Sequence, residues 1–77
     1  MNNYDRIMEV LEENFLGASI DNVTDDDIID TLHENGLECT LFWNEYSPEF
    51  NQRYVNIKEV VGSIVFSFKD GKCVEIY

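Results

Sequence analysis

The chain has 77 residues, of which 44% are hydrophobic and 13% aromatic, and its formal net charge is −11. This length fits a single domain spanning residues 1–77, and the hydrophobic content is too high for a disordered chain. The charge disfavours nucleic acid and anionic membranes as direct partners, because like charges repel each other.

The charge is distributed unevenly along the chain. Residues 1–50 contain 13 acidic side chains and one basic side chain, Arg6, which gives −12. Residues 51–77 contain three acidic and four basic side chains, which gives +1. An acidic N-terminal part beside a nearly neutral C-terminal part favours a basic protein as partner. The alternative is that the acidic side chains only keep a small protein soluble.

The sequence carries no sign of secretion or of membrane insertion. Its N-terminal residues include several acids instead of the basic region and apolar core of a signal peptide. No apolar run approaches the roughly 20 residues of a membrane span. Cys39 and Cys73 are too few for a disulfide scaffold. We therefore expect a cytoplasmic protein with two reduced cysteines, either a monomer or a homodimer.

The first predicted helix follows Asn3 as N-cap and ends at Gly17. Its apolar residues recur at helical spacing and form one stripe: Tyr4, Ile7, Met8, Leu11 and Phe15. The acids Glu9, Glu12 and Glu13 lie away from that stripe. Residues 18–23 are ambiguous, being either a loop or a short edge strand with Ile20 pointing inward.

The second predicted helix has clear signals at both ends. Thr24 is the N-cap with Asp27 three residues later, which is an Asp version of the capping box. Asn35-Gly36 ends the helix. Asp25, Asp26 and Asp27 fill the first turn, where the helix dipole stabilises negative charge. The dipole explains acids at this place, although three adjacent carboxylates exceed what capping requires.

Strands are predicted for residues 37–46 and 53–60, and the last eighteen residues form a hairpin around Asp70-Gly71. In the first strand, alternation places Leu41 and Trp43 on one face. For the hairpin, a two-residue turn pairs Phe68 with Cys73. A three-residue loop with a bulge at Gly71 is preferred, because the two-residue turn leaves Glu75 on the apolar face, whereas the bulge places only Lys72 there, at the turn end. That face contains Ile64, Phe66, Phe68, Val74 and Ile76.

The expected fold class is therefore α+β, with two N-terminal helices packed on one face of a four-stranded antiparallel β-meander. A short strand near Ile20 would make the sheet five-stranded.

The sequence lacks the motifs of the common enzyme classes. His33 is the single histidine, so the paired histidines of a zinc-protease helix are absent. The run Asp25–Asp27 lacks the spacing and the glycine of a calcium loop. No glycine-rich loop suited to phosphate occurs. We expect a protein that is not an enzyme and that uses no metal and no cofactor.

Two sets of residues are candidates for partner binding. Carboxylates spaced along helices can imitate DNA phosphates, which follow each other at about one charge per 1.7 Å of duplex. The residues that could supply such a row are Asp5, Glu9, Glu12, Glu13, Asp25, Asp26, Asp27, Asp30 and Glu34. The second set is the aromatic segment 42–54, because aromatic residues are common at binding hot spots. Within it Phe42 and Tyr46 are the contact candidates, and Trp43 and Tyr54 are expected to cap the core.

The order helix, short strand, acidic helix and four antiparallel strands resembles the phage uracil-DNA glycosylase inhibitor family. Ala18-Ser19-Ile20 keeps the Ser-Ile of that family's first strand and lacks the Glu before it. The resemblance implies a DNA mimic in which Asp25 and Asp26 contact the enzyme. It also implies an apolar pocket that receives one enzyme side chain. The residues placed to line this pocket are Val23, Ile28, Leu32, Val55 and Ile57.

The leading hypothesis is a non-enzymatic, phage-encoded inhibitor in the host cytoplasm. It would bind the basic nucleic-acid-binding surface of a host enzyme, such as uracil-DNA glycosylase, a restriction enzyme or a CRISPR effector. Other small acidic phage inhibitors, including anti-restriction and anti-CRISPR proteins, use negative charge in the same way but do not share the fold of the glycosylase inhibitor family. The alternative is a cytoplasmic adaptor or regulatory module that binds its partner through the aromatic segment 42–54.

Overall fold

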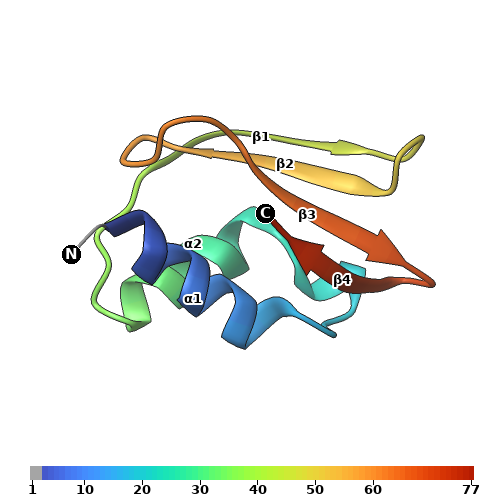
Figure 1. Cartoon of the computed structure of the whole chain (residues 1–77), viewed down its shortest axis with the longest axis horizontal. Coiled ribbons are helices and arrows are strands. Elements are labelled where there is room, and N and C mark those ends of the chain that lie inside the picture. Colours follow the sequence, from blue (N-terminus) through green and yellow to red (C-terminus); the bar gives the residue numbers. More distant parts are fainter. Residues whose placement is uncertain (1–2) are drawn as a thin grey trace.

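The computed structural model describes residues 3–77. Helix α1 (Asn3–Phe15) is followed by a short 3-10 helix η1 (Ile20–Asn22) and helix α2 (Asp25–Glu34). Four strands follow: β1 (Leu41–Ser47), β2 (Gln52–Ile57), β3 (Ile64–Lys69) and β4 (Lys72–Ile76). The strands form one antiparallel sheet in the order β1-β2-β3-β4, and both helices lie on one face of it (Figure 1). The predicted α+β arrangement is confirmed.

Helix α1 packs its apolar stripe onto the sheet. Ile7, Met8, Leu11 and Phe15 are buried as predicted, whereas Tyr4, the first residue of the predicted stripe, is 39% exposed. The Phe15 ring meets Phe66 of β3 edge-on at a centroid distance of 6.0 Å. The helix begins at Asn3 itself, so this residue lies in the first turn instead of preceding it as a cap.

Residues 17–20 pair with the outer edge of β4. The Gly17 N–H donates to the Cys73 carbonyl at 2.7 Å, and the Cys73 N–H donates to the Ala18 carbonyl at 2.9 Å. The Ile20 N–H donates to the Gly71 carbonyl at 2.8 Å. The chain then turns into η1, so the segment predicted as loop or strand combines a short edge pairing with a helical turn.

Helix α2 carries both predicted caps. Thr24 Oγ1 accepts the Asp27 N–H at 3.2 Å and donates to Asp27 Oδ2 at 2.9 Å. At the other end, Gly36 has a φ of +79°. Its N–H donates to the His33 carbonyl and the Leu37 N–H donates to the Leu32 carbonyl. This pair of bonds is the Schellman motif that satisfies the last carbonyls of the helix.

The β3–β4 hairpin differs from the preferred prediction. Asp70 and Gly71 both have positive φ, 53° and 78°, which makes a two-residue turn of type I′ and pairs Phe68 with Cys73. A bulge then leaves Val74 as an extra residue, so Phe66 pairs with Ile76. The bulge lets Cys73 and Ile76 both face the core. The predicted three-residue loop, with Val74 on the buried face, is therefore wrong.

Strand β1 contains a second bulge, at Phe42. Leu41 pairs with Ile57, but Trp43 pairs with Asn56, so Phe42 is the extra residue. Beyond the bulge, Asn44 and Tyr46 share the inner face with their partners Val55 and Arg53. The expectation that Leu41 and Trp43 share a face is wrong, because one additional residue reverses the alternation.

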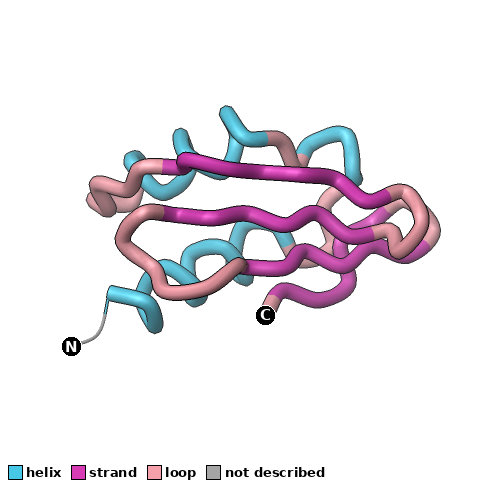
Figure 2. Tube along the Cα trace, turned by 90° about the horizontal axis from the view of Figure 1, so that it is seen from above, coloured by secondary structure: helices cyan, strands magenta, loops and turns pink. Residues whose placement is uncertain are grey.

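The core lies between the helices and the inner face of the sheet. Helix α1 contacts β4, helix α2 contacts β1, and the two helices contact each other. Val55 and Ile57 point into this core as predicted. Seen from above, the four strands lie side by side with the helices on their far side (Figure 2). The outer face of the sheet therefore has no helix on it within residues 3–77.

Candidate functional site

The carboxylates chosen from the sequence all lie on exposed residues of the two helices. Because α1 and α2 lie side by side on one face of the sheet, these residues belong to a single layer, which we call the acidic helical layer (Figure 1). The layer comprises Asp5, Glu9, Glu12 and Glu13 of α1 with Asp25, Asp26, Asp27, Asp30 and Glu34 of α2. The fold thus brings together two acidic stretches that are separated in the sequence.

Few cations neutralise the acidic helical layer. Arg6 pairs with Glu9 within α1, and Arg53 Nη1 lies 3.4 Å from Asp25 Oδ1. Across residues 3–77 these are the two ion pairs. The other carboxylates of the layer therefore have no ion-pair partner among residues 3–77.

The first turn of α2 gives three of these carboxylates a defined position. The Thr24 cap fixes where the helix begins, and Asp27 is bonded to that cap through both its N–H and its carboxylate. Asp25, Asp26 and Asp27 then follow on a regular helical backbone at the positive end of the helix dipole. Their spacing is set by the helix and not by a flexible loop.

Arg53 connects α2 to the sheet and was missed from the sequence. Its side chain is 19% exposed. Its Nη1 donates to Asn44 Oδ1 at 2.8 Å, and its guanidinium carbon lies 5.7 Å from the centre of the Tyr46 ring. The Nε atom is buried and has no hydrogen-bond partner among the described residues. Strand alternation places Arg53 on the same inner face of the sheet as Val55. This alternation was the one feature of the sequence that could have indicated its position.

The apolar pocket implied by the resemblance is not an open pocket here. Val23, Ile28, Leu32, Val55 and Ile57 are all fully buried, because they pack against one another in the core. This prediction is wrong.

An open hollow does lie beside that part of the core, between η1 and the β1–β2 hairpin. Its lining is mixed and partly charged, with Ile20, Asp21, Thr24, Tyr46 and Arg53.

The structure separates the two aromatic candidates. Phe42 is 66% exposed at the β1 bulge. Tyr46 points inward, where its ring meets Phe68 at 6.3 Å, and its hydroxyl donates to Asn51 Oδ1 at 3.3 Å. Trp43, which was expected to cap the core, is 46% exposed on the outer face of the sheet. Tyr54 shares that outer face and is half-buried there, so its expected role as a core cap is also wrong.

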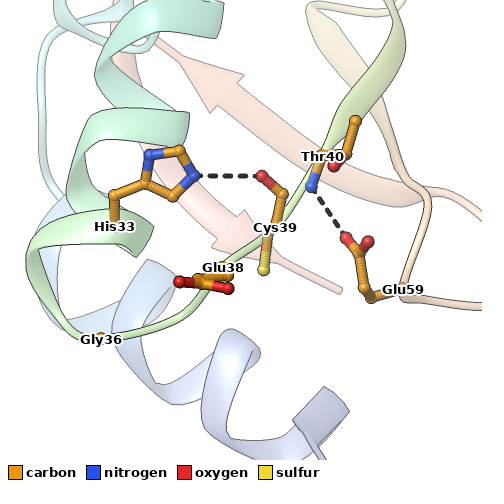
Figure 3. A pocket seen from close by; sticks show the side chains of 6 residues that line it. All are labelled: His33, Gly36, Glu38, Cys39, Thr40 and Glu59. Carbon is orange, nitrogen blue, oxygen red and sulfur yellow. Dashed lines mark hydrogen bonds between the residues drawn. The ribbon is translucent and has the colours of Figure 1, made fainter.

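A second hollow lies between the end of α2 and the segment before β1 (Figure 3). The His33 Nε2–H donates to the Cys39 carbonyl at 3.1 Å, and the Thr40 N–H donates to Glu59 Oε1 at 2.8 Å. Burial, with a smaller effect from Glu59, raises the pKa of the Cys39 thiol. A protonated thiol is a poor nucleophile. The His33 Nε2 atom is bonded to a backbone carbonyl, so it does not activate the Cys39 thiol.

The described residues offer no further chemical centre. Within residues 3–77, no three or more His, Cys, Asp or Glu side chains are grouped so that they could hold a metal ion. None of the helices in this range has the length and apolar character needed to cross a membrane. Comparisons with protein-family models, with curated proteins and with solved structures found no match. The functional argument therefore rests on the geometry and the charge of this chain.

Proposed function

We propose that this protein is a non-enzymatic inhibitor whose acidic helical layer binds the basic nucleic-acid-binding surface of an enzyme. The observation that supports this most is the layer itself. Its nine carboxylates lie on exposed residues of two adjacent helices, and two of them are paired with an arginine within residues 3–77. A row of fixed carboxylates offers a basic groove the same attraction as the phosphates of DNA.

The first turn of α2 is the centre of the proposed contact. The Thr24 cap bonds to Asp27 and fixes the helical backbone on which Asp25 and Asp26 also lie, so little backbone freedom is lost when these residues pair with Lys or Arg. Asp30 lies one turn further along the same helix. The segment from Ile7 to Gln52 contains no Lys or Arg, so no cation within it opposes a basic partner.

The targets that fit this proposal are bacterial enzymes that grip nucleic acid through a basic groove. Uracil-DNA glycosylases, restriction enzymes and CRISPR effectors belong to this class, and the inhibitor would be phage-encoded and act in the host cytoplasm. The element order supports the first of these targets, whereas Ala18 in place of the family's Glu weakens it.

The test removes three charges without altering the helix cap. In Asp25→Asn/Asp26→Asn/Asp27→Asn, the side chain at 27 keeps an acceptor for Thr24. The matched control, Glu38→Gln/Asp70→Asn/Glu75→Gln, removes three exposed charges outside the layer. Each variant is immobilised and used to capture proteins from a bacterial lysate at low and at high salt, with mass spectrometry as the readout.

We expect the unchanged protein and the control to retain a nucleic-acid-binding enzyme at low salt and to release it at high salt. The helix variant should bind that enzyme at least about tenfold more weakly, which corresponds to about 1.4 kcal/mol. Equal capture by the helix variant, with circular dichroism showing an intact fold, would refute the proposal.

A second function is favoured by one observation, the exposure of Phe42, Trp43 and Phe50 at the β1 side of the sheet. In this proposal the protein is an adaptor or regulatory module that binds a partner through the aromatic segment 42–54. Phe42→Ala should then abolish capture of the partner, and salt should have little effect.

A further inference from the structure

The two edges of the sheet differ in whether other residues pair with them. The outer edge of β4 is covered by residues 17–20, through the three backbone hydrogen bonds described above. Strand β1 forms the opposite edge, and none of the described residues pairs with its outer side (Figure 2). An uncovered edge presents a row of backbone N–H and C=O groups to another chain.

The backbone groups that point outward from β1 can be identified from the ladder. Val65 of β3 exchanges both of its hydrogen bonds with Tyr77, so its backbone groups face the β4 side. Tyr54 is the β2 partner of Val65, and in an antiparallel ladder its own groups must then face β1, where it pairs with Glu45. Asn44 and Tyr46, on either side of Glu45, therefore direct their N–H and C=O groups away from the sheet.

The usual devices that block an edge are mostly missing from β1. Within Leu41–Ser47 there is neither Lys nor Pro, and the single irregularity is the bulge at Phe42. The regular part beyond the bulge contains both outward-facing residues, Asn44 and Tyr46. Exposed aromatic side chains flank this part, with Phe42 and Trp43 before it and Phe50 at 63% exposure after it.

The charge beside this edge selects the kind of partner. Glu45 lies within β1 and Glu49 in the turn that follows, and both are exposed. Strand β1 itself contains no cation, and Lys58, which follows β2, lies at the other end of β1, where its N–H bonds to Thr40. A second copy of this chain, paired antiparallel through Asn44 and Tyr46, would place Glu45 opposite its own counterpart, and like charges directly opposite each other are destabilising. An extended segment with Lys or Arg would instead find carboxylates and aromatic faces, both of which attract cations.

We propose that β1 is a strand-addition site, which accepts an extended basic peptide segment of a protein partner through the backbone of Asn44 and Tyr46. Main-chain hydrogen bonds would provide binding, and the carboxylates and aromatic rings would select basic side chains. This site lies at the sheet edge, apart from the exposed residues of the acidic helical layer. It therefore does not depend on the inhibitor function of that layer, and it would specify an extended basic segment as the partner in the alternative adaptor function of segment 42–54.

The test uses a peptide that matches β1 in length. The probe is a seven-residue peptide of alternating lysine and valine, added to the isotopically labelled protein and followed by amide chemical shifts. The control peptide has the same side chains and charge, but every interior amide is N-methylated, so neither of its edges can pair. We expect shifts centred on Asn44 and Tyr46 and at least tenfold weaker binding of the methylated peptide.

A pair of variants tests the same site from the protein side. Asn44→Pro removes the outward N–H, and Pro is tolerated at an edge strand when that N–H faces solvent. Asn44→Ala loses the same side-chain bond to Arg53 but keeps the N–H, so it is the matched control. The peptide should bind to the alanine variant and to Asp25→Asn/Asp26→Asn/Asp27→Asn, and binding to a folded proline variant should fall at least tenfold.

Three results would overturn the proposal. Equal binding of both peptides would mean that charge alone holds them. Shifts on α1 and α2 instead of β1 would place the peptide on the acidic helical layer. Sedimentation of the free protein as a dimer that Asn44→Pro converts to a monomer would identify a second copy as the occupant of the edge.

Discussion

Replacing Arg53 by Met tests whether this arginine holds the start of α2 against the sheet. Met keeps an apolar stem of similar length and removes the guanidinium. Three interactions are lost: the 2.8 Å bond to Asn44, the contact with the face of Tyr46 and the ion pair with Asp25. One unfavourable feature is also removed, namely the buried Nε without a partner among residues 3–77.

The magnitudes decide the expected sign. A hydrogen bond to a charged group contributes about 1.5–3 kcal/mol, and a cation over an aromatic face about 0.5–1 kcal/mol. The Asp25 pair is 3.4 Å long and its carboxylate is half-exposed, so its contribution is close to zero. Relief of the buried Nε returns about 1–3 kcal/mol. The free energy of unfolding should therefore fall by only about 1 kcal/mol.

Urea unfolding followed by circular dichroism measures this change. For a protein of this size the slope is about 1 kcal/mol per molar, so the midpoint should fall by about 1 M. Arg6→Met is the matched control, because it removes a cation from an exposed pair with Glu9 and produces the same net charge. Its midpoint should change by less than about 0.5 M. A similar loss in both variants would show that overall charge, and not the site of Arg53, sets the stability.

Two further predictions concern β4 and the thiols. Val74 is 55% exposed and Cys73 is 1% exposed, so Val74→Asp should change the free energy of unfolding by less than about 0.5 kcal/mol, whereas Cys73→Asp should unfold the protein. Circular dichroism measures both outcomes. Unfolding by Val74→Asp together with a folded Cys73→Asp variant would refute the bulged register. Burial raises the pKa of the Cys39 and Cys73 thiols above the ordinary value of 9.0, so the unfolded chain releases these protons first. Stability should then be complete below pH 9.0 and be lost as the pH rises through the folded-state pKa values, in urea titrations. Cys39→Ala/Cys73→Ala should remove this part of the alkaline loss.

The parts of the fold that follow from local chemistry could be predicted from the sequence. The Thr24 cap, the Gly36 terminus and the apolar stripe of α1 involve residues a few positions apart, and all three are confirmed. The hairpin turn at Asp70-Gly71 was located correctly for the same reason. Such signals act within one or two turns of the chain, so they do not depend on how distant elements pack.

The bulges could not be predicted in this way. Alternation over β4 offered two registers, of which one placed Glu75 and the other placed Lys72 among the apolar residues. The structure adopts neither of them along the whole hairpin, because the bulge at Val74 changes the register part of the way along β4. The bulge at Phe42 reverses the faces of Trp43 and Tyr46 in the same manner. A bulge gives up regular ladder pairing locally in exchange for burial of apolar side chains, and this balance depends on the opposing strand and helices.

The residues of the candidate site also differ in how far they could be predicted from the sequence. Exposure of the acids could be predicted, because ionised carboxylates stay in water unless they are paired. The role of Arg53 could not be predicted, because its side chain on β2 contacts residues of β1 and α2, which are distant from it in sequence. The same limit applies to the predicted apolar pocket, whose residues could be assigned to the inner faces but not recognised as already packed together.

The segment without Lys or Arg, from Ile7 to Gln52, includes nearly all of α1, the whole of α2 and the whole of β1. Because α2 contacts β1, the acidic helical layer and the open edge lie on neighbouring elements of the fold. Four of the five basic residues instead follow this segment, on β2, at the end of β2 and around the β3–β4 turn. An acidic protein that needed only solubility would gain nothing from such segregation, since net charge alone is sufficient for that purpose. Segregated charge is what a surface directed at a basic partner requires.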